Sequence, residues 1–282
     1  MNSTIVRSAF GVVTTAIALA AAHPALAQTQ GRLDARYVVS LANVPIGKGA
    51  WVIDIAENQF TAAASGATAG LLRIFASGQG SGASRGLMVG GSPVPATFAA
   101  SITSDKKTEE IRMTLGSGNV KDFVVTPVLP EDPNRIPLTD AHRHGVSDPM
   151  TGSLLRVAGT GNVMSPLACQ HTTPIFDGRM RYDLQFAYKR MENVKTEKGY
   201  EGPVVVCAVY FTPVAGYVPS RSTVKYLTSQ RDMEVWLAPI AATRVVVPYR
   251  VSIPTPMGTG VMQATQYITS APPRAAAYTR TD

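Results

Sequence analysis

The feature that most constrains the fold is a repeated alternation of apolar and polar side chains with a period of two residues. The clearest example spans residues 179–186. Its apolar members are Met180, Tyr182, Leu184 and Phe186, and its polar members are Arg179, Arg181, Asp183 and Gln185. Because successive side chains of a strand point to opposite faces, this pattern predicts an antiparallel strand with one face toward a core and one toward water.

Other runs with the same period occupy residues 51–56, 111–115 and 244–251. Strand-like runs recur about every 8–15 residues, a spacing typical of a sandwich, a barrel or a wrapped sheet. Pro248 has no N–H to donate, so its strand is expected to be an edge or to hold Pro248 where no ladder bond forms. We therefore predict a mainly β protein, built as an antiparallel wrapped sheet or half-open barrel with one or two short helices.

Turn residues separate these runs. Residues 45–47 are expected to follow the first strand, residues 116–119 to form a hairpin loop, and Asp177-Gly178 to turn the chain before the strand at 179–186. The glycine-rich residues 78–82 lack the lysine and the following helix of a phosphate-binding loop, so we interpret them as a flexible turn.

Short helices are expected at two places, residues 68–75 and residues 147–157. In the second, Ser147 or Asp148 is a suitable N-cap, and Pro149 fits the first turn, where its missing N–H is harmless. Gly152 weakens this helix by about 1 kcal/mol relative to alanine.

The N-terminus predicts export. Residues 1–27 combine a basic start, a short apolar stretch and an Ala-Leu-Ala ending, the pattern of a signal peptide cleaved near Ala27. We expect a single β-rich periplasmic domain over residues 28–267, with a Pro-rich connection at 126–149 inside it and a loose C-terminal tail at 268–282. No later apolar run reaches the length of a membrane-spanning helix, so no integral membrane segment is expected after cleavage.

The chain contains two cysteines, Cys169 and Cys207. An even number in an exported protein predicts a disulfide bond between them. Such a bond would close a loop of about 38 residues and stabilise the fold by roughly 3–4 kcal/mol.

The formal net charge is +7. In an exported protein this charge favours an anionic envelope component as partner over nucleic acid, although it also simply aids solubility. No nucleic-acid partner is therefore expected.

Candidate chemistry is sparse, and we expect no cofactor and no metal. His142, His144 and His171 are the histidines left after cleavage, and no further metal ligands lie near them in sequence. The enzymatic alternative is a periplasmic hydrolase that uses one of these histidines with Ser147 or Asp148. A second alternative is an outer-membrane β-barrel, since such barrels also show export signals and alternating strands.

Several short motifs also occur in a particular order along the chain. They are Pro45-Ile46-Gly47, Asp148-Pro149-Met150, Phe176-Asp177-Gly178-Arg179 with Arg181-Tyr182, Cys207, Pro213-Val214-Ala215-Gly216 and Trp236-Leu237-Ala238-Pro239. In this order, behind a signal peptide, they resemble exported bacterial proteins of the domain-of-unknown-function family 3108. The likeness covers roughly Tyr37 to Thr265. It implies a periplasmic, β-rich protein and supplies no catalytic residues.

Taken together, these patterns predict an exported cell-envelope protein without enzymatic activity. We expect it to bind an apolar, lipid-like ligand or an envelope partner, because a half-open barrel offers a concave surface on which such a ligand can lie.

Overall fold

The computed structural model describes residues 30–69, 78–105 and 107–271. Seven consecutive strands form the first part of the sheet. They are β1 (Gly31–Leu41), β2 (Val44–Ile55), β3 (Gln59–Thr68), β4 (Gly78–Val89), β5 (Ser92–Ser104), β6 (Lys107–Gly116) and β7 (Asn119–Thr126). Each pairs antiparallel with its neighbour in sequence.

The sheet continues on the other side of β1 with strands from the C-terminal half. They are β15 (Gly258–Ser270), β14 (Val245–Thr255), β13 (Glu234–Pro239), β12 (Glu201–Ala215), β10 (Arg181–Lys195) and β9 (Thr172–Phe176). Two short strands, β8 (Leu155–Arg156) and β11 (Lys198–Gly199), pair with β14 and β15. The order β7-β6-β5-β4-β3-β2-β1-β15-β14-β13-β12-β10-β9 confirms the predicted antiparallel wrapped sheet.

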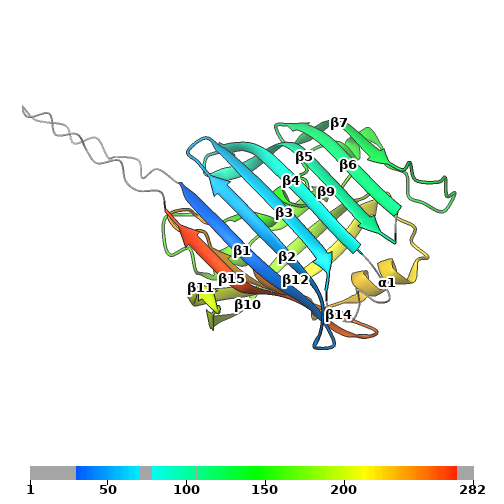
Figure 1. Cartoon of the computed structure of the whole chain (residues 1–282). Coiled ribbons are helices and arrows are strands. Elements are labelled where there is room, and N and C mark those ends of the chain that lie inside the picture. The colour runs from blue at the N-terminus through cyan, green and yellow to red at the C-terminus, as the bar shows by residue number, and fades with distance from the viewer. Residues whose placement is uncertain (1–29, 70–77, 106, 272–282) are drawn as a thin grey trace, which may run out of the picture.

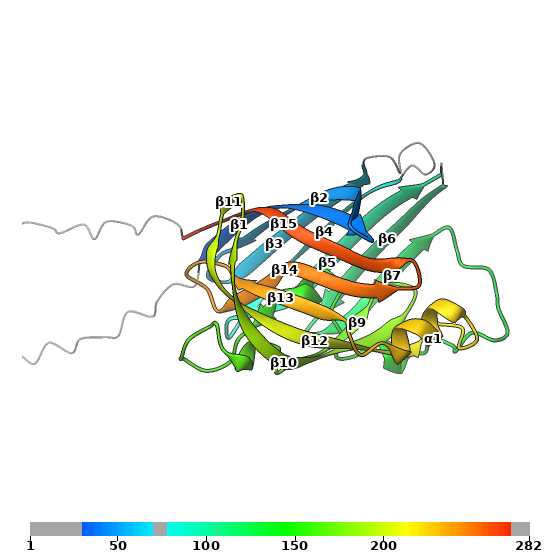
Figure 2. The ribbon, with the colours of Figure 1, turned by 90° about the horizontal axis from the view of Figure 1, so that it is seen from below.

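The sheet curves so that β1–β7 and the strands from β14 to β9 form two walls that face each other (Figures 1 and 2). One row of side chains crosses the first wall and packs into the space between the walls. It consists of Leu33, Ile53, Ala62, Ser84, Phe98, Met113 and Phe123, one from each of β1 to β7. We call the face that bears this row the inner face. The largest core cluster joins it to Val204, Val206 and Trp236 of the opposite wall.

The two edge strands, β7 and β9, do not pair with each other, so the sheet stays open. A short segment of the Pro-rich connection lies between them. Its His144 bridges Asn119 of β7, and Ser147 N donates to Pro174 O of β9 (2.9 Å). Phe176 N in turn donates to Ser147 O (2.9 Å). The connection therefore joins both edges at one point.

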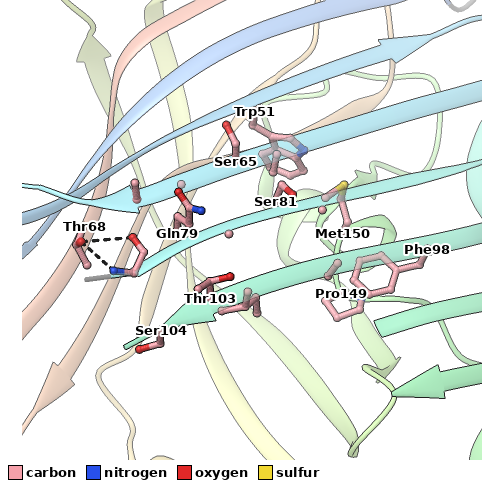
Figure 3. Close-up of a pocket in the computed structure, with 18 residues that line it drawn as sticks. Trp51, Ser65, Thr68, Gln79, Ser81, Phe98, Thr103, Ser104, Pro149 and Met150 are labelled. Carbon is pink, nitrogen blue, oxygen red and sulfur yellow. Dashed lines mark hydrogen bonds between the residues drawn. The ribbon is translucent and has the colours of Figure 1, made fainter. Parts of the chain in front are cut away.

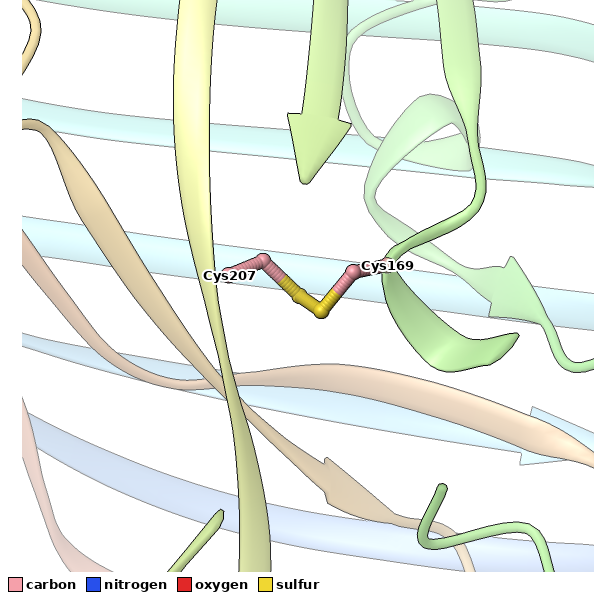
Figure 4. The surroundings of a disulfide bond; sticks show 2 residues. All are labelled: Cys169 and Cys207. Carbon is pink, nitrogen blue, oxygen red and sulfur yellow. A yellow bond between two sulfur atoms is a disulfide. The ribbon is translucent and has the colours of Figure 1, made fainter. Parts of the chain in front are cut away.

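The predicted disulfide is present between Cys169 and Cys207, with an S–S distance of 2.02 Å (Figure 4). Cys207 lies in the middle of β12, and Cys169 ends the 3₁₀ turn Pro166–Cys169. Both are fully buried in a second core cluster with Val205, Val235 and Leu237. The bond thus fastens the segment after β8 to one face of the second wall.

The helix predicted over residues 147–157 is wrong. This segment contains only the 3₁₀ turn Thr151–Ser153 and the short strand β8. The physical reason is that the adjacent Leu154 and Leu155 are buried in different core clusters, which requires an extended backbone between them. Of the other helix candidate, Thr68 ends β3, and residues 70–77 lie outside the described part of the chain.

The helix that does occur, α1 (Ser222–Ser229), was not predicted. It is short, has no buried residue and lacks a side-chain N-cap, so it carries almost none of the usual start signals.

Turns and strand ends confirm some expectations and correct others. Residues 116–119 form the predicted hairpin between β6 and β7, with Ser117 and Gly118 at positive φ. The first hairpin, however, turns at Ala42 and Asn43, both at positive φ, and residues 45–47 belong to β2. β15 runs to Ser270, past the boundary expected at 267.

Pro248 does not lie on an edge, because β14 is flanked by β13 and β15. It stands beside a register shift in the β13–β14 ladder, where a proline is tolerated. Its carbonyl oxygen accepts a hydrogen bond from Tyr37 Oη at 2.8 Å.

A candidate ligand-binding trough

Three glycines lie side by side on the inner face of the first wall. Gly49 of β2 pairs with Gly66 of β3, and Gly66 pairs with Gly80 of β4. Tyr37 and Ile102 end this row on β1 and β5. Because glycine has no side chain, three adjacent strands present bare backbone here, and the inner face is hollow at this point.

The next row toward the packed core is also made of small side chains except at one end. Trp51 of β2 pairs with Ala64, Ala64 with Gly82, and Gly82 with Ala100 of β5. Except for Tyr37 and Gly49, the residues of these two rows line an open hollow of about 670 Å³, which we call the glycine trough (Figure 3). This volume falls in the range of small-molecule sites, about 300–1,000 Å³.

The walls of the glycine trough are apolar and carry no charge among the described residues. The larger side chains that line it are Trp51, Phe98, Ile102, Pro149 and Met150. Figure 3 shows the hydroxyl residues Thr68, Thr103 and Ser104 toward one end, and Trp51, Met150 and Phe98 toward the other. The arrangement is suited to an apolar chain and offers no group that would hold an ion.

A second hollow of about 420 Å³ extends the trough across β2 to β1 and β15. It shares Trp51 and Ala64 with the first hollow and ends at Val39 and Met262. The concave surface is therefore continuous over six strands, β15 and β1 to β5.

Residues 78–82 are not the flexible turn that their composition suggested, because they form the start of β4. Their glycines lie on the inner face at every second position, and the exposed Gln79 and Ser81 between them also border the trough. The period of two was present in the sequence, but glycine at the inner positions removed the apolar signal that marks a strand.

A buried carboxylate fixes the loop that closes one end of the trough. Asp148 is fully buried, and its Oδ2 accepts hydrogen bonds from Ser84 Oγ (3.0 Å) and Thr151 Oγ1 (2.6 Å). Its Oδ1 accepts from the backbone N–H groups of Met150 (3.0 Å) and Thr151 (2.9 Å). Asp148 thereby ties the loop to β4 and holds Pro149 and Met150 against the trough.

Burial raises the pKa of Asp148 above its ordinary value, and hydrogen bonds from Thr151, Ser84 and Met150 offset only part of that rise. Between the unfolded and the raised folded pKa, the folded protein holds more protons than the unfolded chain. Stability therefore falls as pH rises through this interval, which begins near the ordinary value of 3.8.

We expect the stability difference between the wild type and Asp148→Asn to report this titration, since the amide cannot ionise. Urea unfolding at a series of pH values should show the wild type losing stability relative to Asp148→Asn as pH rises above 3.8. Asp54→Asn, which also removes one acidic group but at an exposed position on β2, is the control. A pH-independent difference for Asp148→Asn would contradict the assignment.

The structure does not assemble the residues of the hydrolase alternative. His142 Nδ1 accepts a hydrogen bond from Thr139 N (3.1 Å), and His144 Nδ1 lies 3.1 Å from Asn119 Oδ1. His171 is half-buried with an unpartnered Nε2, and burial lowers its pKa. Among the described residues, none of these imidazoles is hydrogen-bonded to Ser147 or Asp148.

The structure also gives Ser147 and Asp148 roles that differ from the predicted ones. Ser147 acts through its backbone, which pairs with β9. Asp148, expected as a helix cap or a catalytic partner, instead caps a buried turn and holds the trough loop. Over the described ranges, no cluster of three or more histidine, cysteine or acidic residues is arranged to bind a metal. In the same ranges, no helix is both long and apolar enough to cross a bilayer.

The glycine trough, and the place of Trp51 in its lining, were not predicted from the sequence. The available signal was the spacing of glycines at alternate positions 47 and 49, and again at 78, 80 and 82. Only the pairing of β2, β3 and β4 shows that these positions are neighbours.

The fold and the trough define an open, β-barrel-like protein with a concave apolar site between its two walls. The chain belongs to the family described as protein of unknown function (DUF3108), whose profile matches residues 36–265. This match confirms the resemblance drawn from the motifs.

A search of curated proteins found no match. Among solved structures, the chain is similar to the crystal structure of a β-barrel-like protein of domain of unknown function DUF1849 from Brucella abortus. The two share 10% sequence identity with a TM-score of 0.43, over 86% of this chain and 98% of that chain.

Proposed function

We propose that this protein is an exported, non-enzymatic component of the bacterial cell envelope that binds one unbranched acyl chain of a lipid in the glycine trough. The observation that carries the proposal is the row Gly49, Gly66 and Gly80, which leaves an open apolar hollow on an otherwise packed inner face. Monomeric proteins rarely leave such apolar surface open unless something binds there.

The chemistry of the lining favours an acyl chain over other occupants. Among the described residues that line the larger hollow of the trough, none is charged, so a ligand that buried an ionic group there would lose hydration without gaining a partner. The exposed Lys48 borders only the smaller of the two hollows. The floor is backbone and methyl groups, and the larger walls are Trp51, Phe98 and Ile102. A flexible hydrocarbon chain matches such a long, shallow surface, and its burial gains about 0.8 kcal/mol per CH₂.

The predicted export of the protein is a second argument for the proposal. The signal-like pattern at residues 1–27 lies outside the described residues, and it predicts a periplasmic product. The buried Cys169–Cys207 bond is typical of an oxidising compartment.

Fractionation of cells should release the mature protein with the periplasm. Recovery with outer-membrane proteins would support the barrel alternative, and an uncleaved, cytoplasmic product would contradict export.

The trough is tested by two neighbouring alanines on β3 that differ in the face they occupy. Ala64 lines the trough, whereas Ala63 is exposed on the opposite face. Ala64→Leu is expected to weaken binding of methyl dodecanoate about tenfold or more, because the added carbons occupy the space of the chain. The measurement is displacement of the uncharged dye Nile red from the purified protein.

Ala63→Leu adds the same bulk outside the trough and should bind as the wild type does. Circular dichroism and urea unfolding of both variants check that the fold is kept. Equal binding by wild type, Ala64→Leu and Ala63→Leu would contradict a ligand in the trough. Loss of an envelope protein partner in Ala64→Leu, with no lipid binding in any form, would assign the trough to a protein partner instead.

A further inference from the structure

The deep wall of the glycine trough contains a hydrogen-bond donor without an acceptor. Trp51 is 9% exposed, and its indole Nε1 is buried and makes no hydrogen bond. The other tryptophan shows the usual arrangement, since Trp236 Nε1 donates to Glu192 Oε2 at 2.8 Å. A buried donor left unpaired costs about 1–3 kcal/mol and is uncommon in native proteins, so it requires an explanation.

The position of Trp51 links this donor to the ligand site. Trp51 lines both hollows of the trough, and it lies in the row that continues through Ala64 and Gly82. Met150 packs over this row, with its Cε 3.3 Å from the point that a Cβ on Gly82 would occupy. In Figure 3, Trp51 and Met150 lie toward the same end of the pocket, opposite Thr68.

Met150 is the side chain that can move to admit a ligand atom. It is only partly buried, it comes from the loop held by Asp148, and its unbranched thioether has three rotatable bonds. The backbone of the loop stays fixed by the hydrogen bonds of Asp148.

We propose that the chain bound in the trough carries an uncharged hydrogen-bond acceptor, such as an ester or amide carbonyl oxygen, and that Trp51 Nε1 donates to it. This inference rests on the proposed function and specifies its ligand. The acceptor is uncharged because no cation lines the larger hollow, and Lys48, which borders the smaller one, is exposed and lies on the opposite face of β2 from Trp51. A carboxylate next to the indole would therefore be desolvated without a counter-charge. A plain hydrocarbon would leave the donor unpaired.

The test compares three probes of equal chain length: methyl dodecanoate, dodecane and dodecanoate. Each competes with Nile red for wild type, Trp51→Phe, Trp236→Phe and Ala64→Leu. Wild type should prefer methyl dodecanoate over dodecane about tenfold, the size of one net hydrogen bond, and should bind dodecanoate more weakly than the ester. Trp51→Phe should bind dodecane within about twofold of wild type and lose most of the ester preference.

Trp236→Phe is the matched control, because its indole is already paired outside the trough, and it should keep the ester preference. It also leaves Trp51 as the single tryptophan of the chain, so a shift in its fluorescence on adding the ester, and not on adding dodecane, is a second readout in an unaltered trough.

Failure of the proposed function and failure of the role of Trp51 give different results. If Ala64→Leu binds every probe as wild type does, the proposed function fails and this inference fails with it. If Ala64→Leu loses binding while wild type and Trp51→Phe show the same ester preference, or dodecanoate binds as well as the ester, only the role of Trp51 is overturned.

Discussion

Replacing Asp148 by alanine is expected to lower the free energy of unfolding by about 3–5 kcal/mol, because the change leaves several buried hydrogen-bond donors without their carboxylate acceptor. Ser84 Oγ and the backbone and side chain of Thr151 all donate to this carboxylate, and Ser84 and Thr151 are themselves buried. Each unpaired buried donor costs about 1–3 kcal/mol. Urea unfolding at neutral pH measures the loss.

Two variants control this prediction. Asp148→Asn keeps the shape and one acceptor oxygen, so it should cost clearly less than alanine. Asp54→Ala removes an exposed carboxylate whose partner is Arg32, and surface ion pairs contribute at most about 1 kcal/mol. A loss below about 1 kcal/mol for Asp148→Ala would show that the cluster around this residue is not the anchor of the loop.

Removing the disulfide is expected to cost about 3–4 kcal/mol, since it frees a loop closed over 38 residues in the unfolded chain. The double variant Cys169→Ala, Cys207→Ala tests this by urea unfolding. Both cysteines are fully buried, so removal of the two sulfur atoms also leaves a small cavity, which adds to the loss.

Reduction of the wild type provides the matched control. Dithiothreitol should lower the stability of the wild type by about 3–4 kcal/mol, no more than the double substitution does, and should leave the double variant unchanged. If the double variant is as stable as the oxidised wild type, the bond does not fasten the segment after β8 in the way that the structure indicates.

Local periodicity predicts much of this fold. The alternation at 179–186 predicts the start of β10, although the strand itself begins at Arg181, because Asp177 Oδ1 holds Arg179 and Met180 in the turn before it. The cysteine count and the export pattern predict the Cys169–Cys207 bond. The strand prediction depends on residues that are adjacent in sequence, and the disulfide prediction depends on the even number of cysteines.

The features that sequence reasoning missed depend on contacts between distant segments. Residues 147–157 have the apolar spacing of a helix, but Leu154 and Leu155 are drawn into separate clusters by strands more than 50 residues later, such as β14. Asp148 reads as a helix cap until Ser84 of β4 is placed beside it. Local patterns contain no information about either contact.

The trough illustrates the same limit for function. Each of Gly49, Gly66 and Gly80 alone suggests a turn or a weak strand. Their meaning comes from the register of β2, β3 and β4, which places them in one row. Trp51 reads as an ordinary core residue until its unpartnered Nε1 is seen at the end of that row.

The most direct test of the account is to identify what the protein carries when it is purified without detergent from cell envelopes. Lipid-directed mass spectrometry of wild type, Ala64→Leu and Ala63→Leu is the measurement. The account predicts an acyl lipid that accompanies wild type and Ala63→Leu in near-equal molar amount and is absent from Ala64→Leu. An acyl lipid retained equally by Ala64→Leu, or absent from all three proteins, would contradict it.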